Sequence, residues 1–283
     1  MELPTSARLT LHEGTGPVYY SFPSFDRLPF VRHGFSTRLG GVSRDPYATM
    51  NLSFTRGDEV DAVRENFDLF CCGLGLEAEN VVVSAQEHHT NLYCATAADR
   101  GRGVTRERGY SDIDGLLTNE PGVVLCTQYA DCVPLFFVDP VRKVVATSHA
   151  GWKGTAARIG KVTVERMKQE YGCHPEDILA GIGPSIGPCC FEVDKPVADA
   201  FTALEESGDD AVRRRKDEKY DVDLWEINRR ILLNAGITAE HITVTDLCTR
   251  CHPDVFWSHR AAGPLRGSLA GFIALVDCRE EGK

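Results

Sequence analysis

The sequence predicts an α/β or α+β fold built on a mixed sheet, and three observations support this prediction. Short apolar runs, rich in β-branched and aromatic residues, alternate with segments of helical periodicity along most of the 283-residue chain. The runs typical of strands outnumber those typical of helices. Several of these strand-like runs also follow one another directly, with no helical segment between them.

The individual elements follow from these patterns. Predicted strands cover residues 81–84, 123–127, 135–138, 144–148 and 272–276. Predicted helices cover residues 60–71, 155–171 and 223–234. The second helix has apolar residues roughly on one side and Gly172 just past its end, while Ala235 and Gly236 end the third.

The charge distribution excludes several classes of protein. Lys and Arg total 31 against 41 Asp and Glu, a net charge of −10, whereas a general nucleic-acid binder needs a basic surface. No apolar run approaches the roughly 18 residues of a membrane span. Residues 1–13 lack the pattern of a signal peptide, so a cytoplasmic protein is expected. The charged tract at residues 205–221 is predicted to be a solvated surface loop whose charges compensate one another.

The chain contains eleven cysteines, an odd number in a long chain, which is not typical of a disulfide-stapled scaffold. Most are expected to be reduced and buried. Cys248, Cys251 and His252 match the C-x-x-C-H pattern of haem attachment, but without an export signal or a nearby Met ligand the match is interpreted as coincidence. The neighbours Cys189 and Cys190 are expected to point in different directions, so none of these four cysteines is predicted to bind metal.

Two segments combine reactive side chains with an unusual local sequence. Arg38 precedes Gly40 and Gly41, which allow positive φ and close backbone approach. Arg38 is therefore either a residue that binds a phosphate or carboxylate through two parallel hydrogen bonds, or a surface arginine in an ordinary turn. Cys132 follows Asp131 between two apolar runs, and it is either a nucleophile, a metal ligand or a buried structural thiol.

Two further segments place histidines after predicted strands. His149 ends a strand just before a helix begins, which is where α/β proteins commonly build sites. The glycines that follow it do not have the spacing of a P-loop. His88 and His89 follow the strand at 81–84, and because adjacent side chains on an extended chain point to opposite faces, at most one of the two should serve a given site.

Taken together and in this order, these segments resemble the YfiH-like, laccase-domain family. The matching strings run from about His33 to Cys278 and are HGFSTRLGGVS, NLSF, QEH, DIDGLLT, ADCVPLFFVD, SHAGWKGT, GPSIGPCCFEV, DLWEINRRIL and CT followed by FWSHR. The resemblance implies a single domain over residues 1–283, with its core at about 30–280. It also implies a cysteine-hydrolase-type fold in which mixed sheet layers are flanked by helices.

The family, once described as polyphenol oxidases, is regarded as one of zinc-dependent purine nucleoside phosphorylases. The resemblance implies zinc ligands at His88, Cys132 and His149, with His89 outside the site. Two imidazoles and one thiolate leave the fourth tetrahedral position open, as in catalytic zinc sites. Copper is the alternative metal, but laccase chemistry needs several histidine-rich sites, and the nine histidines here are mostly scattered.

The implied activity is phosphorolysis of adenosine, inosine and S-methyl-5'-thioadenosine by inorganic phosphate, with adenosine deamination as a second activity. The candidates for binding substrate and phosphate are Arg38, Asn51 and Lys153. The candidates for catalytic groups are Cys132 and the carboxylates of Asp131 and Asp114. The two carboxylates would carry protons or accept hydrogen bonds from the ribose hydroxyls. The expected partners are a small nucleoside and phosphate, with no nucleic acid, membrane or obligatory protein partner.

A cysteine hydrolase is the alternative function, in which Cys132 is the nucleophile and His149 its base. It follows from the same resemblance, since a peptidoglycan-precursor editing amidase role has been attributed to relatives. A metal-bound interaction module is a third interpretation, which the open ligand position disfavours.

The sequence departs from the family pattern near its end. The family has S-Y-R-R followed by T-G-R, whereas this chain has Ser258-His259-Arg260-Ala261 followed by Leu265-Arg266-Gly267. Arg266 is the candidate to replace the missing arginine. Lys153 also replaces an arginine that is frequent in relatives. This replacement keeps the positive charge but loses the ability to form two parallel hydrogen bonds to one anion.

Overall fold

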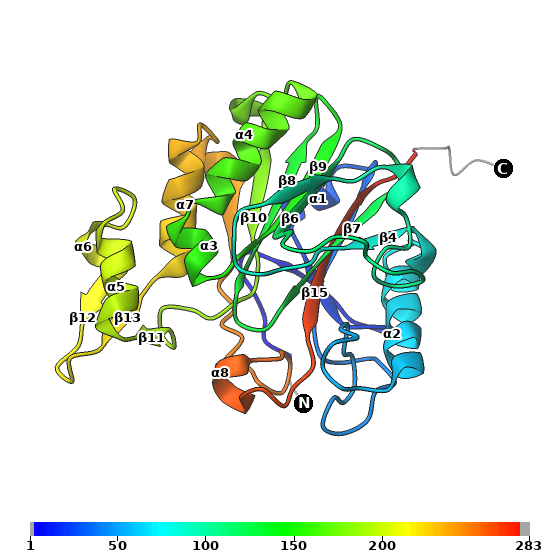
Figure 1. The fold of residues 1–283 in the computed structure, drawn as a ribbon, viewed down its shortest axis with the longest axis horizontal. Helices are drawn as coiled ribbons and strands as arrows, with labels where there is room; N and C mark the ends of the chain where they lie inside the picture. The colour runs from blue at the N-terminus through cyan, green and yellow to red at the C-terminus, as the bar shows by residue number, and fades with distance from the viewer. Residues whose placement is uncertain (1–2, 278–283) are drawn as a thin grey trace.

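Two six-stranded sheets packed face to face form the centre of the structure, with helices on both outer sides (Figure 1). This computed structural model describes residues 3–277, so Cys278 lies outside the described residues. The first sheet has the strand order β1 (Thr10–His12), β2 (Tyr19–Ser21), β3 (Val31–Ser36), β15 (Leu269–Leu275), β7 (Val124–Tyr129) and β4 (Val81–Val83). The second has the order β14 (Ile242–Val244), β10 (Leu179–Ile182), β8 (Val133–Asp139), β9 (Val144–Ala150), β6 (Gly115–Thr118) and β5 (Leu92–Cys94). The predicted class, α/β with mixed sheet layers flanked by helices, is confirmed.

Both sheets mix parallel and antiparallel neighbours, as predicted. In the first sheet β4 runs parallel to β7, and the other neighbouring strands pair antiparallel. In the second, β5 is parallel to β6 and β14 to β10, while β10, β8, β9 and β6 pair antiparallel. The β8–β9 hairpin pairs Val133 with Ala150 and Asp139 with Val144. This register brings the residue before β8 close to the end of β9.

The alternation of side chains along each central strand explains the stacking of layers. Along β8, Leu135 and Phe137 belong to the core under the outer helices, whereas Phe136 and Val138 belong to the core between the two sheets. Gly271 of β15 allows close approach of the sheets, since a Cβ there would lie 2.5 Å from the Phe136 ring. Burial of both faces accounts for the continuous apolar runs that predicted these strands.

The helices cover the two outer faces. In Figure 1, α2 (Val60–Gly73) lies against the first sheet, while α4 (Ile159–Tyr171) and α7 (Leu224–Asn234) lie against the second. The helix predicted at 155–171 is divided into α3 (Trp152–Ala156) and α4, because Arg158 between them has a φ of 58°, outside the α-helical region. The remaining helical segments are short, namely α1 (Pro23–Asp26), η1 (Ala78–Asn80), η2 (Ala97–Asp99), η3 (Pro175–Asp177), α5 (Lys195–Thr202), α6 (Gly208–Ala211), η4 (Ala239–His241) and α8 (His259–Ala262). None of the helices within residues 3–277 combines the length and apolar character needed to cross a bilayer.

The tract predicted as a surface loop is more regular than expected. Its residues form α6, β12 (Val212–Arg214) and part of β13 (Tyr220–Val222), and these two strands join β11 (Glu192–Val193) in a small third sheet. Charges of opposite sign pair within the tract, where Arg215 lies 3.3 Å from Asp217 and 3.2 Å from Asp221. Strands of two or three residues with charged side chains are too short for their alternation to be recognised in the sequence.

Candidate metal centre

The β8–β9 hairpin brings Cys132 and His149 together. Cys132 directly precedes β8, and His149 lies near the end of β9, opposite Pro134. His88 joins them from the segment after β4, with its Nε2 3.9 Å from the Cys132 Sγ. The ligand atoms of all three side chains lie within 4.8 Å of one another. The three residues expected to converge therefore form one cluster.

One buried carboxylate shapes the segment that carries His88. Asp114 is fully buried, and its oxygens accept the backbone N–H groups of Glu87, His88 and His89 at 2.9–3.0 Å. The chain turns there, and His88 has a φ of 67°. His88 consequently points into the cluster, whereas His89 is exposed and lies 2.6 Å from Asp112. Only one of the adjacent histidines belongs to this cluster, and a turn, not a continuing strand, separates the two side chains.

Asp114 also orients His149. The Nδ1 of His149 lies 2.8 Å from Oδ1 of Asp114, and both side chains are buried. Burial alone would raise the pKa of Asp114, but the hydrogen bonds from His149 and from the backbone amides outweigh burial and hold this pKa below its ordinary value. The ionised carboxylate accepts a hydrogen bond from Nδ1, which leaves Nε2 of His149 free to bind a metal or a thiol proton.

Cys132 is prepared to act as a thiolate. Burial raises the pKa of its thiol, but the neighbouring imidazoles of His149 and His88 outweigh burial and lower this pKa to about 6. Gly151 provides the space for the cluster, since a Cβ there would lie 2.8 Å from Cδ2 of His88 and 3.2 Å from the Cys132 Sγ. A thiolate between two imidazoles can bind a borderline metal ion or act as a nucleophile.

The three side chains line a cavity of about 170 Å³. The other residues that line it are Thr55, Arg56, Gln86, Arg108, Gln128, Tyr129, Ala130, Arg266 and Ser268. This wall contains three arginines and no carboxylate. It is therefore suited to an anionic ligand.

Arg266 is the most constrained of these arginines. It is 7% exposed, its Nη1 donates to the carbonyl of Gly267, and its buried Nε has no hydrogen-bond partner. Burial and the nearby Arg56 lower the pKa of Arg266 to about 10, which still leaves it charged at neutral pH. The sequence had indicated Arg266. Arg56 and Arg108 carried no recognisable signal and were missed.

The structure does not bring Arg38, Asn51 or Lys153 into the wall of this cavity. The Arg38 guanidinium donates to the carbonyls of Ala48 and Pro253 and stacks on Trp257, 3.7 Å from the ring centroid. In this geometry Arg38 joins two loops, and its guanidinium does not face the cavity in which the clustered residues lie.

Asn51 and Lys153 lie outside the cavity for different reasons. Asn51 is buried, and its Oδ1 accepts the backbone N–H of Ser268 at 2.9 Å, so it positions the loop that carries Arg266. Lys153 is exposed on α3, with its Nζ 5.7 Å from the ring of Trp152.

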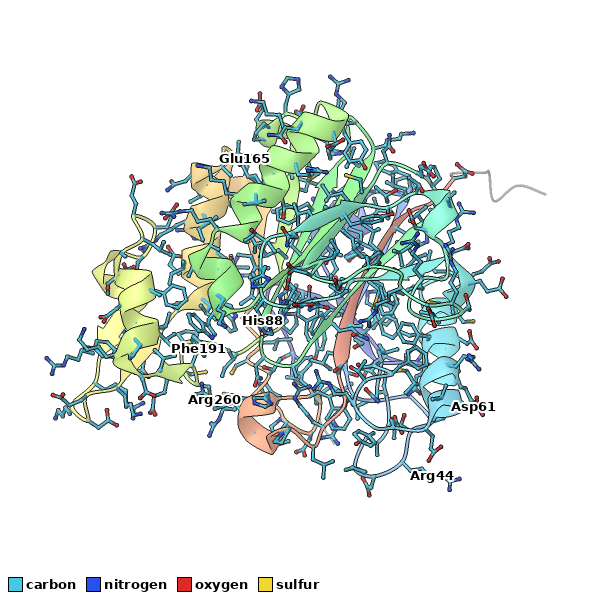
Figure 2. All side chains as sticks on the ribbon, viewed as in Figure 1. Arg44, Asp61, His88, Glu165, Phe191 and Arg260 are labelled. Atoms are coloured by element: carbon cyan, nitrogen blue, oxygen red, sulfur yellow. The ribbon has the colours of Figure 1, made fainter. Side chains whose placement is uncertain are left out.

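The two carboxylates expected to act in catalysis both accept hydrogen bonds from groups in or beside the cluster. Asp131 has a φ of 82°, and its oxygens accept hydrogen bonds of 2.6 Å from the Thr249 hydroxyl and the Arg260 backbone N–H. Neither Asp131 nor Asp114 lines the cavity. Both carboxylates act as fixed hydrogen-bond acceptors that hold the segments around the cluster. Figure 2 shows His88 near the middle of the molecule and Arg260 below it.

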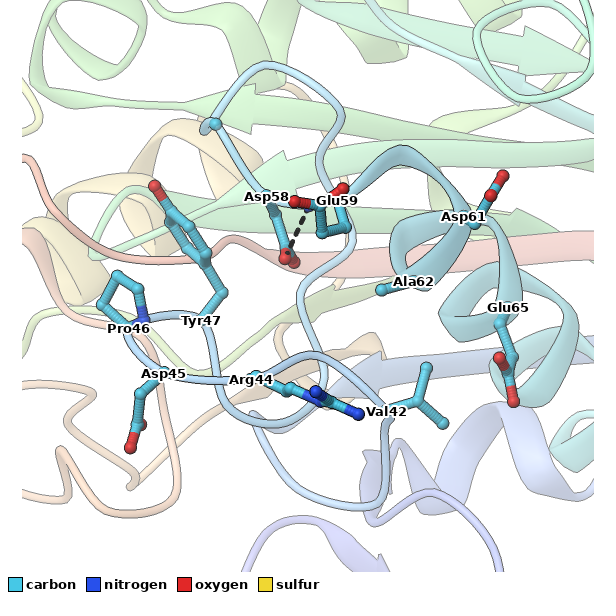
Figure 3. Close-up of a pocket in the computed structure, with 11 residues that line it drawn as sticks. Val42, Arg44, Asp45, Pro46, Tyr47, Asp58, Glu59, Asp61, Ala62 and Glu65 are labelled. Carbon is cyan, nitrogen blue, oxygen red and sulfur yellow. Dashed lines mark hydrogen bonds between the residues drawn. The ribbon is translucent and has the colours of Figure 1, made fainter.

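A second, larger pocket of about 660 Å³ lies between the loop before α2 and the helix itself (Figure 3). It contains none of the three clustered residues, and its wall is acidic, with Asp45, Asp58, Glu59, Asp61 and Glu65. Such a wall repels phosphate, so this pocket is unsuited to the ligand that the smaller cavity favours.

Together, the stacked mixed sheets and the His-Cys-His cluster, in which His149 is buried and His88 is exposed, define a protein with a candidate metal centre beside an arginine-lined cavity. Residues 32–276 match the family model described as multi-copper polyphenol oxidoreductase laccase. The chain belongs to this laccase-like YfiH family.

Similar proteins agree with this assignment. The chain is 38% identical over 245 residues to purine nucleoside phosphorylase YlmD of Bacillus subtilis, covering 86% of this chain and 88% of that protein. It is 35% identical over 248 residues to adenosine deaminase RL5 of an unknown prokaryotic organism, covering 84% and 94%. The crystal structure of the Bacillus licheniformis protein YfiH superposes with a TM-score of 0.87 at 34% identity, covering 94% of this chain and 98% of that one.

Proposed function

We propose that this protein is a zinc-dependent purine nucleoside phosphorylase that cleaves adenosine, inosine and S-methyl-5'-thioadenosine with inorganic phosphate, with adenosine deamination as a second activity. The observation that carries the proposal is the placement of Arg56, Arg108 and Arg266 in the same small cavity as the His-Cys-His cluster. Phosphorolysis needs both a phosphate-binding group and a reactive centre within one substrate length. The names of the relatives support the choice of nucleosides as substrates.

The donor set fits zinc better than copper. His88, Cys132 and His149 offer two nitrogens and one sulfur, and Asp114 orients the imidazole of His149 as an outer carboxylate does in zinc sites. When bound there, zinc supplies Lewis acidity, which deamination needs for the activation of water. Multi-copper chemistry needs several histidine-rich sites, whereas the other possible metal-binding clusters among residues 3–277 contain a single histidine, His89.

The arginines have a direct role in phosphorolysis. In this reaction an oxygen of phosphate forms a bond to the anomeric carbon of the ribose as the bond from that carbon to the purine nitrogen breaks. Arg56, Arg108 and Arg266 would hold the phosphate by charge-assisted hydrogen bonds and fix its oxygen against the sugar. The buried and unpaired Nε of Arg266 is available for one of these bonds.

The decisive experiment is incubation of the purified protein with inosine, with and without phosphate. The expected products are hypoxanthine and ribose 1-phosphate, formed only when phosphate is present. Adenosine without phosphate should give inosine and ammonia if the second activity exists. Release of free ribose at the same rate in both mixtures would contradict phosphorolysis, because the nucleophile would then be water.

The alternative function, a cysteine hydrolase, is favoured by the lowered pKa of Cys132 beside His149. The two functions differ in what the thiolate does. If Cys132 is a metal ligand, chelators should abolish phosphorolysis and added zinc should restore it. If Cys132 is a nucleophile, the chelated protein should hydrolyse amide substrates and lose this activity after alkylation with iodoacetamide.

A further inference from the structure

Four cysteines form a second cluster outside the arginine-lined cavity. Cys189 and Cys190 precede β11, and Cys248 and Cys251 lie in the loop after β14. Their four Sγ atoms lie within 4.8 Å of one another. The Sγ of Cys251 is 3.6 Å from that of Cys189 and 3.5 Å from that of Cys190. All four are free thiols, although two pairs of sulfurs are this close.

The sequence had predicted that Cys189 and Cys190 point apart, and this expectation is wrong. It assumed an extended backbone, in which adjacent side chains face opposite sides. The backbone instead forms a helical turn, in which the N–H groups of Cys190 and Phe191 both donate to the carbonyl of Gly187, at 2.9 and 3.0 Å. Successive side chains in a helical turn are about 100° apart, so both sulfurs reach the same side.

We propose that Cys189, Cys190, Cys248 and Cys251 bind a structural zinc ion, distinct from the metal proposed at the His-Cys-His cluster. A tetrahedral zinc with four sulfurs at about 2.3 Å has sulfur–sulfur separations of about 3.8 Å. The observed separations of 3.5 and 3.6 Å, and the 4.8 Å limit for the whole set, fit this geometry. Four thiolates close the coordination sphere, as in structural zinc sites.

The surroundings favour thiolates over packed thiols. The backbone N–H of Gly187 donates to the Cys248 Sγ at 3.2 Å, and Nη1 of Arg250 donates to the Cys190 Sγ at 3.6 Å. Arg260 donates to the Cys190 carbonyl at 3.2 Å, and its guanidinium carbon lies 5.7 Å from the centroid of the Phe191 ring. Zinc with four thiolates carries a net charge of −2, which these two guanidinium groups would offset. Three of the four cysteines are not fully buried, so an ion can reach them from solvent.

The position of the cluster indicates what the ion would hold together. Thr249, between the two cysteines of the second pair, donates its hydroxyl to Asp131, and the Ile186 N–H donates to the Asp131 carbonyl at 2.9 Å. Asp131 directly precedes Cys132. The proposed zinc would therefore cross-link the two loops that hold Asp131, and so would fix the position of Cys132 without touching substrate.

Metal content of variants tests this proposal. We expect about two zinc ions per chain in the protein purified under reducing conditions, about one in Cys251→Ser and about one in Cys132→Ala. The exposed Cys72 belongs to neither cluster, so the matched control Cys72→Ser should keep about two. Cys251→Ser with undiminished zinc would overturn the proposal.

A second measurement does not depend on the stability of a Cys251 variant. Cys132→Ala removes the sulfur ligand of the first cluster, so sulfur-to-cobalt charge transfer in this variant, after removal of zinc, reports on the four cysteines. We expect an intense near-ultraviolet sulfur-to-cobalt charge-transfer band and the visible bands of a tetrahedral four-thiolate site. Absence of these bands, iron in place of zinc, or a disulfide among the four cysteines under reducing conditions would refute the proposal. None of these results depends on nucleoside cleavage, so failure here leaves the proposed activity untouched.

Discussion

Nδ1 of His149 lies 2.8 Å from Oδ1 of Asp114, and this carboxylate also accepts the backbone N–H groups of residues 87–89. One buried side chain therefore fixes two of the three residues of the cluster: it orients the imidazole of His149 and bends the chain that carries His88. The carboxylate can do both only because it is ionised, and the donors that surround it keep its pKa low.

The first prediction concerns this carboxylate. Asp114→Asn should weaken zinc binding by about 10- to 100-fold. The amide nitrogen of asparagine is a hydrogen-bond donor, and it would replace a carboxylate oxygen that accepts hydrogen bonds from the backbone N–H groups and from His149. The measurement is competition with a chromophoric chelator. Asp112→Asn is the matched control, since Asp112 contacts the exposed His89 and should not affect zinc affinity. Equal affinity in the two variants would show that Asp114 does not orient the ligands.

The second prediction concerns space around the cluster. Gly151 has a φ of −59°, which alanine adopts without strain, so only the added methyl group matters. Because that methyl would overlap His88 and press on Cys132, Gly151→Ala should reduce zinc affinity and activity together. Gly16→Ala, where no atom lies within 4 Å of the added methyl, should leave both unchanged. Normal zinc binding by Gly151→Ala would mean that the ligands are not held as tightly as the structure indicates.

The third prediction separates two arginines. Arg266→Ala should raise the KM for phosphate by about tenfold to a hundredfold, since a charge-assisted contact contributes roughly 1.5–3 kcal/mol. Arg38→Ala should leave this KM unchanged but lower the free energy of unfolding by about 1–3 kcal/mol, because it loses bonds to two carbonyls and its stacking on Trp257. Phosphate kinetics and urea unfolding of both variants test this assignment. The opposite pattern would return the phosphate site to Arg38.

The fourth prediction concerns acid stability. His33 is buried between Phe22 and Phe25, and its Nε2 accepts the Phe22 N–H at 2.8 Å, so the ring is neutral although Asp26 lies 3.8 Å away. Burial lowers the pKa of His33 to about 3, from about 6.5 in the unfolded chain. The stabilisation from this neutral ring is complete above pH 6.5 and is lost as the pH falls, because only the unfolded chain then binds the proton.

His33→Gln keeps an acceptor for Phe22 but cannot titrate. Between pH 6.5 and 4.5, the free energy of unfolding of this variant should fall less steeply with decreasing pH than that of the wild type. The difference between the two slopes should be up to about 1.4 kcal/mol per pH unit. The exposed His174 makes no such buried contact, so His174→Gln is the control and should follow the wild type. Parallel curves for His33→Gln and the wild type, measured by urea unfolding across this range, would contradict the prediction.

Local patterns in the sequence determined the main elements of the fold. The apolar runs that became β7, β8, β9 and β15 were recognisable because both faces of these strands are buried. Helices α2 and α7 were recognisable from apolar residues at helical spacing. The convergence of His88, Cys132 and His149 was predictable only through family resemblance, since no local pattern relates residues so far apart.

Tertiary structure alone decided which polar groups meet. Arg38 was predicted to bind an anion beside its glycines, but its guanidinium donates to the carbonyls of residues 48 and 253, which no local pattern places near it. Arg56 and Arg108 looked ordinary and yet face the cavity. Cys189 and Cys190 meet Cys251 because two loops are joined through Asp131 and because a helical turn aligns the adjacent sulfurs. The period of a pattern specifies which face of a strand or helix is buried, whereas contacts between distant side chains depend on strand register and loop geometry, which are set only when the whole chain packs.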